Sequence, residues 1–444
     1  MTDSGFIVAV IGAGPAGIYA SKQLTAHGHE VVLINKDIKP GGLAEYGIYP
    51  AKHKIREGLR KQFRAILSDP KVHYFGNVEV GEYGDVSLLQ LKEMGFSAIL
   101  VAAGAQAGKF LSIPGEELRG VYQAKDVVYH YNLLPPFSRM PMKIGKKVAI
   151  VGAGNVMMDL ARWLIDEKQV DEVVAVVRRG PAEVKFDKKE LETVIASMDM
   201  NILQQEIDRV SPVMRSIGQD PDAAMAYYQE AYENAEPHSS PTRFLLRFLC
   251  SPRKMVANDH GIVKELVVEE NSLQQANGGT KAIGTGTYKT LNVDTVILAI
   301  GDAVDEKLGL PVTGTQFVGN PNPTYPVEGI SYEVIDFAAE KSTKGIFLAG
   351  WSRQASTGLV GTARKDATNA AAAIQAYLTA EGVKPAQGAP DLLSTLEQLL
   401  PHRVNYAAIQ RLEEYEQTQA ALQGLVEFKL DSNLKMLKVI RGGE

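Results

Sequence analysis

Two glycine-rich turns, each after a short apolar run, are the residues in this chain whose spacing points most directly to chemistry. The first consists of Gly12, Gly14 and Gly17, in the order G-x-G-x-x-G, and it follows the apolar run Ile7–Ile11. In this pattern Gly12 permits a tight turn, Gly14 lets the backbone approach a pyrophosphate, and Gly17 lets the next helix lie close to the strand. The positive N-terminus of that helix then faces the phosphates. The pattern predicts a dinucleotide-binding strand–turn–helix–strand unit over residues 6–35.

A second glycine turn begins about 140 residues later, with Gly152 and Gly154 after the apolar segment Lys147–Val151. A helix-forming segment and another apolar run follow it, as they follow the first turn. Two such units imply either two bound nucleotides or one nucleotide and one degenerate site. We expect two nucleotides.

The residue after each unit's second strand should distinguish the two nucleotides, because a ribose-binding acid is expected there. In the first unit this place holds Asn35, which can hydrogen-bond ribose hydroxyls but carries no charge. In the second unit it holds Arg178 and Arg179. Paired arginines match a 2′-phosphate, and each charge-assisted bond is worth roughly 1.5–3 kcal/mol. We therefore predict NADP(H) at the second site; the alternative is a solvated pair of surface arginines.

The first site is most economically a flavin site. Hydride transfer between NADPH and a tightly held FAD needs alignment rather than an acid–base residue. The single cysteine, Cys250, excludes an internal disulfide, a dithiol relay and any multi-cysteine zinc or iron–sulfur site within one chain. We therefore expect no metal site of that kind, and single-electron carriers must come from outside.

Three further segments are expected to contact a cofactor. The loop over 37–50 is rich in glycine and includes Gly42 and Tyr46. The apolar strands predicted over 97–105 and 345–351 end in small residues, at Gly104 and Gly350. Backbone without side chains at a strand end lets a flat ligand approach closely.

The composition is that of a globular protein with two domains. The 444 residues carry a net charge of −5 with a pI near 6.0, which argues against general nucleic-acid binding. The sequence has no apolar run of about 18 residues and no signal-type N-terminus, so we expect neither a membrane span nor export. A cytoplasmic location is expected.

The predicted fold is α/β, with two Rossmann-like dinucleotide-binding domains and a C-terminal helical tail. The FAD domain is expected to be discontinuous, over 1–107 and 331–380, with the NADP domain over 108–330 inserted in it. Residues 381–444 are expected to form a helical extension that packs on the FAD domain. Within the NADP domain, Arg243 and Arg247 lie four residues apart, on one face if that segment is helical.

Several motifs, in order along nearly the whole chain, resemble those of the adrenodoxin reductase-type ferredoxin–NADP reductases. They are IGAGPAG, GGLAEYGIYP, GNVEVG, GAGNVMMDLAR, RRGPAEVKFDKKEL, LLRFLCSP and AGWSRQASTGLVGT. The sequence differs from the family at Asn35, where an acid is usual, and at Met157, where Ala is usual.

The resemblance implies site residues beyond the glycine turns. It implies FAD contacts from Ala16, Asn35, Leu43, Val80, Trp351, Gly358, Leu359 and Val360. It implies NADP contacts from Gly152, Asn155, Val156, Arg178, Arg179, Glu190 and Gly358. Asp159 matches a family residue near the nicotinamide, whereas Ala51 and Lys52 stand at the places of the family's usual Asp-His pair near the flavin, with His53 one place on. Asp159, Lys52 and His53 are the candidate catalytic residues, and Arg243 and Arg247 are implied to lie on a basic face that docks an acidic ferredoxin.

The predicted function is a flavoprotein oxidoreductase that passes a hydride between NADPH and FAD. Single electrons then pass between FAD and a ferredoxin or flavodoxin, in either direction. One alternative is an NADPH-dependent flavin oxidoreductase with a small-molecule acceptor such as a quinone. The other is a subunit that binds nucleotides without turnover.

Overall fold

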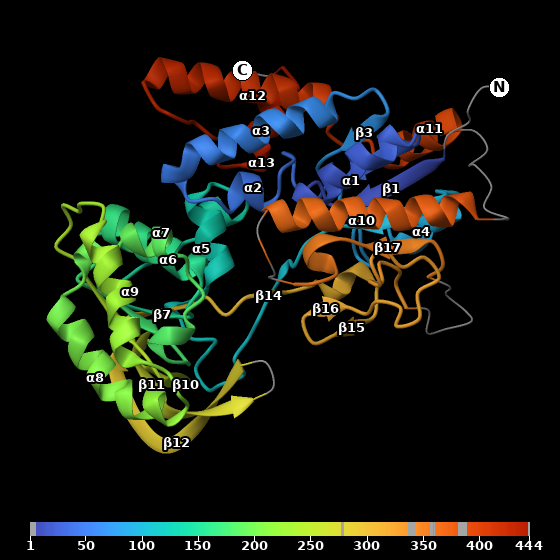
Figure 1. Cartoon of the computed structure of the whole chain (residues 1–444). Helices are drawn as coiled ribbons and strands as arrows, with labels where there is room; N and C mark the ends of the chain where they lie inside the picture. Colours follow the sequence, from blue (N-terminus) through green and yellow to red (C-terminus); the bar gives the residue numbers. More distant parts are fainter. Residues whose placement is uncertain are drawn as a thin grey trace. The chain divides into compact units, whose positions relative to one another are not determined.

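A computed structural model describes residues 6–276, 279–335, 343–355, 358, 360–380 and 389–442. The chain divides into two compact units (Figure 1). The first unit consists of Met1–Gly108, Tyr129–Arg139 and Gly301–Glu444, and the second of Lys109–Val128 and Met140–Ile300. Each unit is built on a parallel sheet, as predicted for an α/β chain with Rossmann-like domains.

The sheet of the first unit has five parallel strands. Their order across the sheet is β17 (Ile346–Leu348), β4 (Ala98–Val101), β1 (Ile7–Ile11), β2 (Glu30–Ile34) and β3 (Val72–Phe75). The central strand β1 is buried along its whole length. Segments far apart in the sequence therefore contribute to one sheet, since β17 lies next to a strand that precedes it by about 250 residues.

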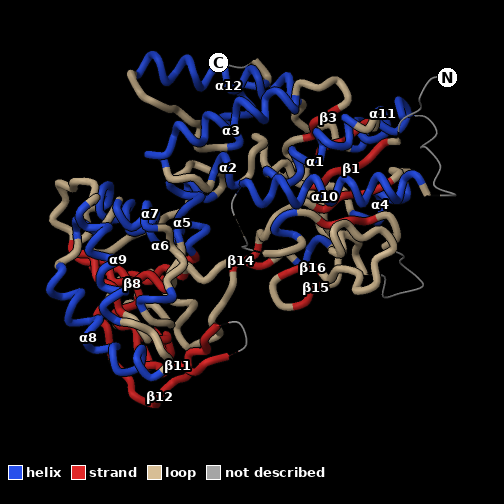
Figure 2. Tube along the Cα trace, in the orientation of Figure 1, coloured by secondary structure: helices blue, strands red, loops and turns tan. Residues whose placement is uncertain are grey.

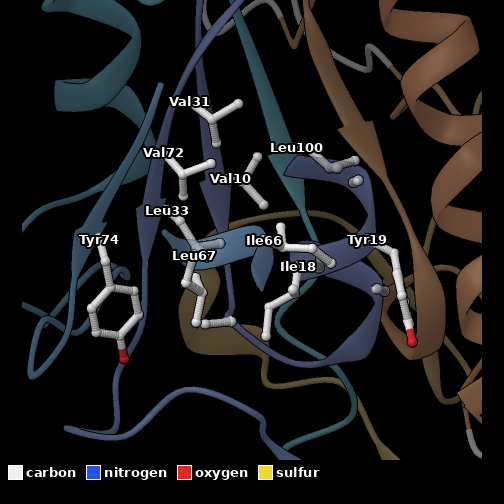
Figure 3. Packing of buried hydrophobic residues seen from close by; sticks show 14 of the residues in the cluster. Val10, Ile18, Tyr19, Val31, Leu33, Ile66, Leu67, Val72, Tyr74 and Leu100 are labelled. Carbon is white, nitrogen blue, oxygen red and sulfur yellow. The ribbon is translucent and has the colours of Figure 1, made fainter. Parts of the chain in front are cut away.

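Alternate residues of β1 face two separate cores, because successive side chains of a strand point to opposite faces. Val8 and Val10 pack in one core, with α1 (Pro15–Ala26), α3 (His53–Leu67) and α10 (Val360–Thr379). In Figure 3 the side chains of Val10, Ile18, Leu33 and Ile66 gather in this core from β1, α1, β2 and α3. Ile7 and Ile11 pack in the other core, which includes residues of α4 (Leu88–Glu93) and α11 (Ala389–Leu399). Burial on both faces explains the continuous apolar runs that the sequence shows.

The rest of the first unit consists of short elements and two C-terminal helices. The helix α12 (Tyr406–Gln423) lies beside α3 in both views (Figures 1 and 2), and Arg64 of α3 pairs with Glu413 of α12 at 2.9 Å. The other elements are α2 (Leu43–Tyr46), η1 (Pro50–Lys52), β5 (Ala107–Gly108), η2 (Phe137–Arg139), β14 (Asp302–Ala303), η6 (Glu306–Leu308), β15 (Val312–Thr313), β16 (Gln316–Phe317), η7 (Gly350–Ser352) and α13 (Asn433–Ile440).

The second unit combines a parallel and an antiparallel sheet. The parallel order is β6 (Val121–Gln123), β13 (Thr295–Leu298), β7 (Lys147–Val151), β8 (Glu172–Val176) and β9 (Arg243–Arg247). The strands β10 (Cys250–Ala257), β11 (Val263–Ala276) and β12 (Gly279–Asn292) form the antiparallel sheet, and they share a hydrophobic core with β7, β8 and β13. The helical elements are α6 (Asn155–Trp163), the π-helix η3 (Leu164–Lys168), η4 (Pro181–Glu183), α7 (Lys188–Glu192), η5 (Ile195–Ser197), α8 (Met200–Ser216) and α9 (Pro221–Glu233); α5 (Ala124–Tyr131) begins in this unit and ends in the first.

The segment that holds Arg243 and Arg247 is the edge strand β9 and not a helix, so the shared helix face, expected if the segment were helical, does not occur. Phe244 and Leu246 are buried, while Arg243, Leu245 and Arg247 are more exposed. This alternation has the period of a strand, and it decides the structure of the segment.

Among the described residues, none of the helices combines the length and the apolar character needed to cross a bilayer.

Candidate functional site

The first glycine turn lies at the carboxyl end of β1, and its three glycines have different surroundings. Gly12 has φ +100°, and a Cβ added there would lie 2.4 Å from the carbonyl oxygen of Ala102. A Cβ on Gly17 would lie 1.9 Å from the carbonyl oxygen of Gly12. A Cβ on Gly14 meets nothing within 4 Å. Gly12 and Gly17 are thus required by packing within the protein, whereas Gly14 borders open space that a ligand can enter.

The first turn of α1 begins at this open space. No side chain caps the helix, whose first residue is Pro15. The backbone N–H groups of a first helical turn have no partner within the helix, and together with the helix dipole they attract an anion. Gly350, after β17, packs against this turn, since a Cβ added to it would lie 2.7 Å from the Cβ of Ala16.

A second glycine pair packs on the first turn. The N–H of Gly41 donates to the carbonyl of Ala13 at 2.7 Å, and a Cβ on Gly42 would lie 3.0 Å from the Cα of Gly14. Gly41 and Gly42 have φ +118° and +51°, a region that favours glycine. The loop that runs on through Leu43 to Tyr46 is thereby fixed against the phosphate side of the predicted nucleotide site.

The side chain of Asn35 is fully engaged within the protein. Its Oδ1 accepts the N–H of Ala13 at 3.0 Å. Its Nδ2 donates to the carbonyls of Asp37 and Lys39 at 2.9 and 3.1 Å, and to the hydroxyl of Tyr74 at 3.3 Å. Asn35 therefore joins the glycine turn to the loop after β2, a role that the sequence did not indicate.

The carboxyl ends of β4 and β17 are joined by side chains that sequence reasoning missed. The N–H of Gly104 donates to Oγ of Ser352 at 3.0 Å. On α10, Asp366 accepts the N–H of Gly350 at 2.6 Å and the Nε of Arg353 at 3.0 Å. Asp366 is buried. The available signal in the sequence was a single acid in an alanine-rich helical segment, because such an acid needs partners if it becomes buried.

The remaining residues predicted in the first unit occupy varied surroundings. Trp351 lies in η7 and is half-buried, as is Val80, which forms an isolated bridge with Val86. Tyr46 is buried, and Leu43 packs against it. Lys52 ends η1 and His53 begins α3, both half-buried. Val360 is the first residue of α10, Gly358 precedes it by two residues, and Leu359 lies outside the described residues.

The second glycine turn repeats the geometry of the first. Gly152 has φ +149°, and a Cβ on it would lie 2.4 Å from the carbonyl oxygen of Ala299. A Cβ on Gly154 meets nothing within 4 Å, and no side chain caps α6. Val156 in the first turn of α6 is 47% exposed, whereas Met157 is buried. This site therefore also offers open space in front of an uncapped helix.

Residues 181–187 are held against this second turn by hydrogen bonds. The side chain of Asn155 donates to Asp187 Oδ2 at 2.7 Å and accepts the N–H of Asp187 at 2.8 Å. The N–H of Lys185 donates to the carbonyl of Ala153 at 2.8 Å. Asp159 in α6 and Glu190 in α7 are both half-buried.

Arg178 and Arg179 follow β8, at the same end of the sheet as the glycine turn. Arg178 is exposed and Arg179 is half-buried. Across the described part of the chain, neither guanidinium has a carboxylate partner, and the buried Nε of Arg179 has no hydrogen-bond partner. Buried donors are normally satisfied, so this one is suited to an anionic ligand.

The two arginines predicted to dock a partner have acidic partners within the second unit. Arg243 is 64% exposed and pairs with Glu172. Arg247 donates to the buried carboxylate of Glu206 at 2.7 Å, which also accepts from Arg209. Arg247 is thus tied into the protein, while Arg243 remains accessible.

The carboxyl group of Asp37, in the loop after β2, has a raised pKa. Burial raises the pKa of Asp37 to about 6, an effect that nearby Lys36 partly opposes. No group of three or more His, Cys, Asp or Glu residues able to hold a metal occurs in the ranges that the structure describes.

Comparisons with known proteins agree with this geometry. Residues 6–205 match the family model described as pyridine nucleotide-disulphide oxidoreductase. The chain is 27% identical over 468 residues to NADPH-ferredoxin reductase FprA of Mycobacterium leprae, covering 98% of each chain. It is 26% identical to the mitochondrial NADPH:adrenodoxin oxidoreductase of Arabidopsis thaliana, covering 92% of this chain and 90% of that one. The structure of Mycobacterium tuberculosis FprA in complex with NADPH superposes with a TM-score of 0.80 at 26% identity, over 98% of this chain and 99% of that one.

Proposed function

We infer that this chain, which belongs to the adrenodoxin reductase-type ferredoxin–NADP reductases, transfers electrons between NADPH and a ferredoxin-type iron–sulfur carrier through FAD. The observation that carries this inference is the pair of glycine turns, each opening onto free space in front of an uncapped helix. Within the described residues, arginines without a carboxylate partner stand beside the second turn, at Arg178 and Arg179. Two different dinucleotides, one of them 2′-phosphorylated, account for this arrangement.

FAD accepts a hydride and passes electrons on singly, which is the chemistry that joins a nicotinamide to an iron–sulfur carrier. In our proposal the first unit holds its pyrophosphate at Gly14 and the first turn of α1. The loop at Gly42 and Leu43 and the strand ends at Gly104, Gly350 and Trp351 line the same site.

The second unit is proposed to hold NADP(H). Gly154 and the first turn of α6 would receive its pyrophosphate. Arg178 and Arg179 would bind the 2′-phosphate, with two cationic forks in place of the acid that an NAD site needs. Asn155 holds the turn in shape through Asp187, and Glu190 is proposed to face the nucleotide.

The chain's own contribution to hydride transfer is alignment, since neither reacting group needs a proton from the protein at that step. Asp159, Lys52 and His53 are proposed to hold or move the proton that later accompanies reduction of the flavin. The partner is proposed to be a ferredoxin or flavodoxin. A cytoplasmic location is proposed because a single buried cysteine suits a reducing compartment.

Anaerobic reduction tests this function. The purified protein should carry FAD, and its visible flavin absorbance should bleach when NADPH is added. Reoxidation should then be fast with ferredoxin or flavodoxin and slow with a quinone. Fast reoxidation by the quinone alone would support a reductase with a small-molecule acceptor. A flavin that NADPH does not reduce would support a subunit that binds nucleotides without turnover.

A further inference from the structure

A buried cluster of charged side chains joins the C-terminal segment of the first unit to the loop beside the first glycine turn. We call it the loop clamp, and its members come from the 39–46 loop, from α3 and from the last third of the unit. They are Lys39, Glu45, Arg56, Arg60, Glu416, Glu427 and Lys429.

Glu45 is the centre of the loop clamp. It is 3% exposed, and Arg60 donates to its two oxygens at 2.6 and 2.5 Å. Lys39 and Lys429 also approach it, at 3.3 and 3.1 Å. Burial alone would raise the pKa of Glu45, but the three surrounding cations outweigh burial and hold the pKa well below its usual range. Glu45 is therefore a buried anion whose position depends on those cations.

Of the three C-terminal members of the clamp, Glu416 and Lys429 contact the 39–46 segment. Glu416 of α12 accepts Nζ of Lys39 at 2.6 Å and the N–H of Leu430 at 2.9 Å. Lys429 donates to the backbone carbonyl of Glu45 at 2.9 Å, and its Nζ lies 5.0 Å from the ring centre of Tyr46. Segments more than 370 residues apart in sequence are thus fixed to one another without exposure to water.

The loop that the clamp holds is the one that packs on the glycine turn. Gly41 and Gly42 contact Ala13 and Gly14, and Glu45 follows three residues later. Removing one partner of a buried ion pair is strongly unfavourable, so the loop has one strongly preferred position while the clamp is intact. A loop displaced by about 1 Å would no longer match a bound dinucleotide.

We propose that Glu416 and Lys429 are positioning residues of the flavin site, which hold the Gly41–Tyr46 loop against the first glycine turn. The proposal rests on the assignment of FAD to the first unit. It makes the C-terminal segment a part of cofactor binding although neither residue needs to touch the cofactor.

The test compares Glu416→Gln and Lys429→Met with two matched controls. Glu414→Gln removes an exposed acid from the same helix, and Lys435→Met removes an exposed lysine paired with Asp431. Hydrogen–deuterium exchange of the amides of residues 41–46 is measured on flavin-free protein. The FAD dissociation constant is measured by fluorescence on reconstitution, and the NADPH dissociation constant serves as an internal reference.

We expect faster exchange in the loop and an FAD dissociation constant raised about tenfold or more in both clamp variants. The NADPH constant should change less than about twofold, both controls should match the wild type, and Lys429→Arg should restore part of the FAD affinity. Unchanged exchange in folded clamp variants, or faster exchange with unchanged FAD affinity, would overturn the proposal. A wild type that binds no FAD would instead overturn the proposed function, and the exchange rates would still decide whether the clamp holds the loop.

Discussion

Oδ1 of Asn35 accepts the backbone N–H of Ala13 at 3.0 Å, and this bond joins the end of β2 to the glycine turn after β1. The same carboxamide donates from Nδ2 to two carbonyls and one hydroxyl. An acid at this position could accept from Ala13 but could donate to none of the other three. The hydrogen bonds of the surrounding loop therefore match the carboxamide of Asn35 and not an acid.

Replacing Asn35 by Asp should therefore weaken the protein. The variant loses the bonds donated by the two N–H groups of Nδ2 and places a carboxylate against the carbonyls of Asp37 and Lys39. We expect a loss of about 2–4 kcal/mol in the free energy of unfolding, measured by urea denaturation, together with weaker FAD retention. Asn77→Asp is the control, because Asn77 donates one bond, to the carbonyl of His402, and its change should cost less. Equal or greater stability in Asn35→Asp would contradict this account of the loop.

The two kinds of glycine in the first turn should respond differently to alanine. Alanine at position 12 would have to adopt a positive φ, and its Cβ would lie 2.4 Å from a backbone atom. Gly12→Ala should therefore lower the free energy of unfolding by about 3 kcal/mol or more. Gly14 has φ −78° and open space, so Gly14→Ala should leave the unfolding free energy within about 0.5 kcal/mol. It should nevertheless weaken FAD binding by about tenfold, because the methyl group occupies the ligand's space. Normal FAD affinity in Gly14→Ala would place the cofactor elsewhere.

Asp37 should make stability depend on pH in an unusual direction. Its pKa in the folded protein, about 6, lies above the ordinary value, so folding favours the protonated form. Its contribution to stability is full below about pH 4 and is lost as the pH rises through about 6. Because Asp37 keeps some contact with water, we expect Asp37→Asn to gain about 1–2 kcal/mol at pH 7 and little at pH 4. Unfolding curves at the two pH values measure this difference; an equal effect at both would show that the carboxyl titrates normally.

Substitutions at Arg243 and Arg247 should distinguish an effect on partner docking from an effect on protein stability. Arg247→Ala removes a partner from buried Glu206 and should lower the unfolding free energy by about 1–2 kcal/mol. Arg243→Ala should have little effect on stability, because its ion pair is largely exposed. If Arg243 docks an acidic ferredoxin, its loss should raise the KM for ferredoxin about threefold at low salt and much less at high salt. A KM that is unchanged at low salt would exclude this surface as the docking face.

The local patterns of the sequence were sufficient to predict the central strand of each parallel sheet and both glycine turns. Ile7–Ile11 and Lys147–Val151 are strands as predicted, since an apolar run followed by glycines has few other structures. At Arg243 the helical spacing was misleading, because positions four apart share a face in a strand as well as in a helix. The alternation of buried Phe244 and Leu246 was the better guide.

The parts that could not be predicted depend on pairs distant in sequence. Lys39 pairs with Glu416 and Lys429 pairs with Glu45, and no local pattern of the sequence shows that these charged residues become buried together. The role of Asn35 was missed for the same reason, since its partners Ala13 and Tyr74 lie on other elements. The cofactors could be predicted from local motifs, whereas the side chains that hold their sites in shape could not.

The most direct test of the central claim is rapid anaerobic reduction of the flavin by NADPH and by NADH, in the wild type and in the Arg178→Ala, Arg179→Ala double variant. We expect the apparent dissociation constant for NADPH to rise by about ten- to a hundredfold in the variant, while that for NADH changes little. Equal increases for the two nucleotides, or no reduction of the wild-type flavin by NADPH, would contradict an NADP(H) site that supplies electrons to FAD.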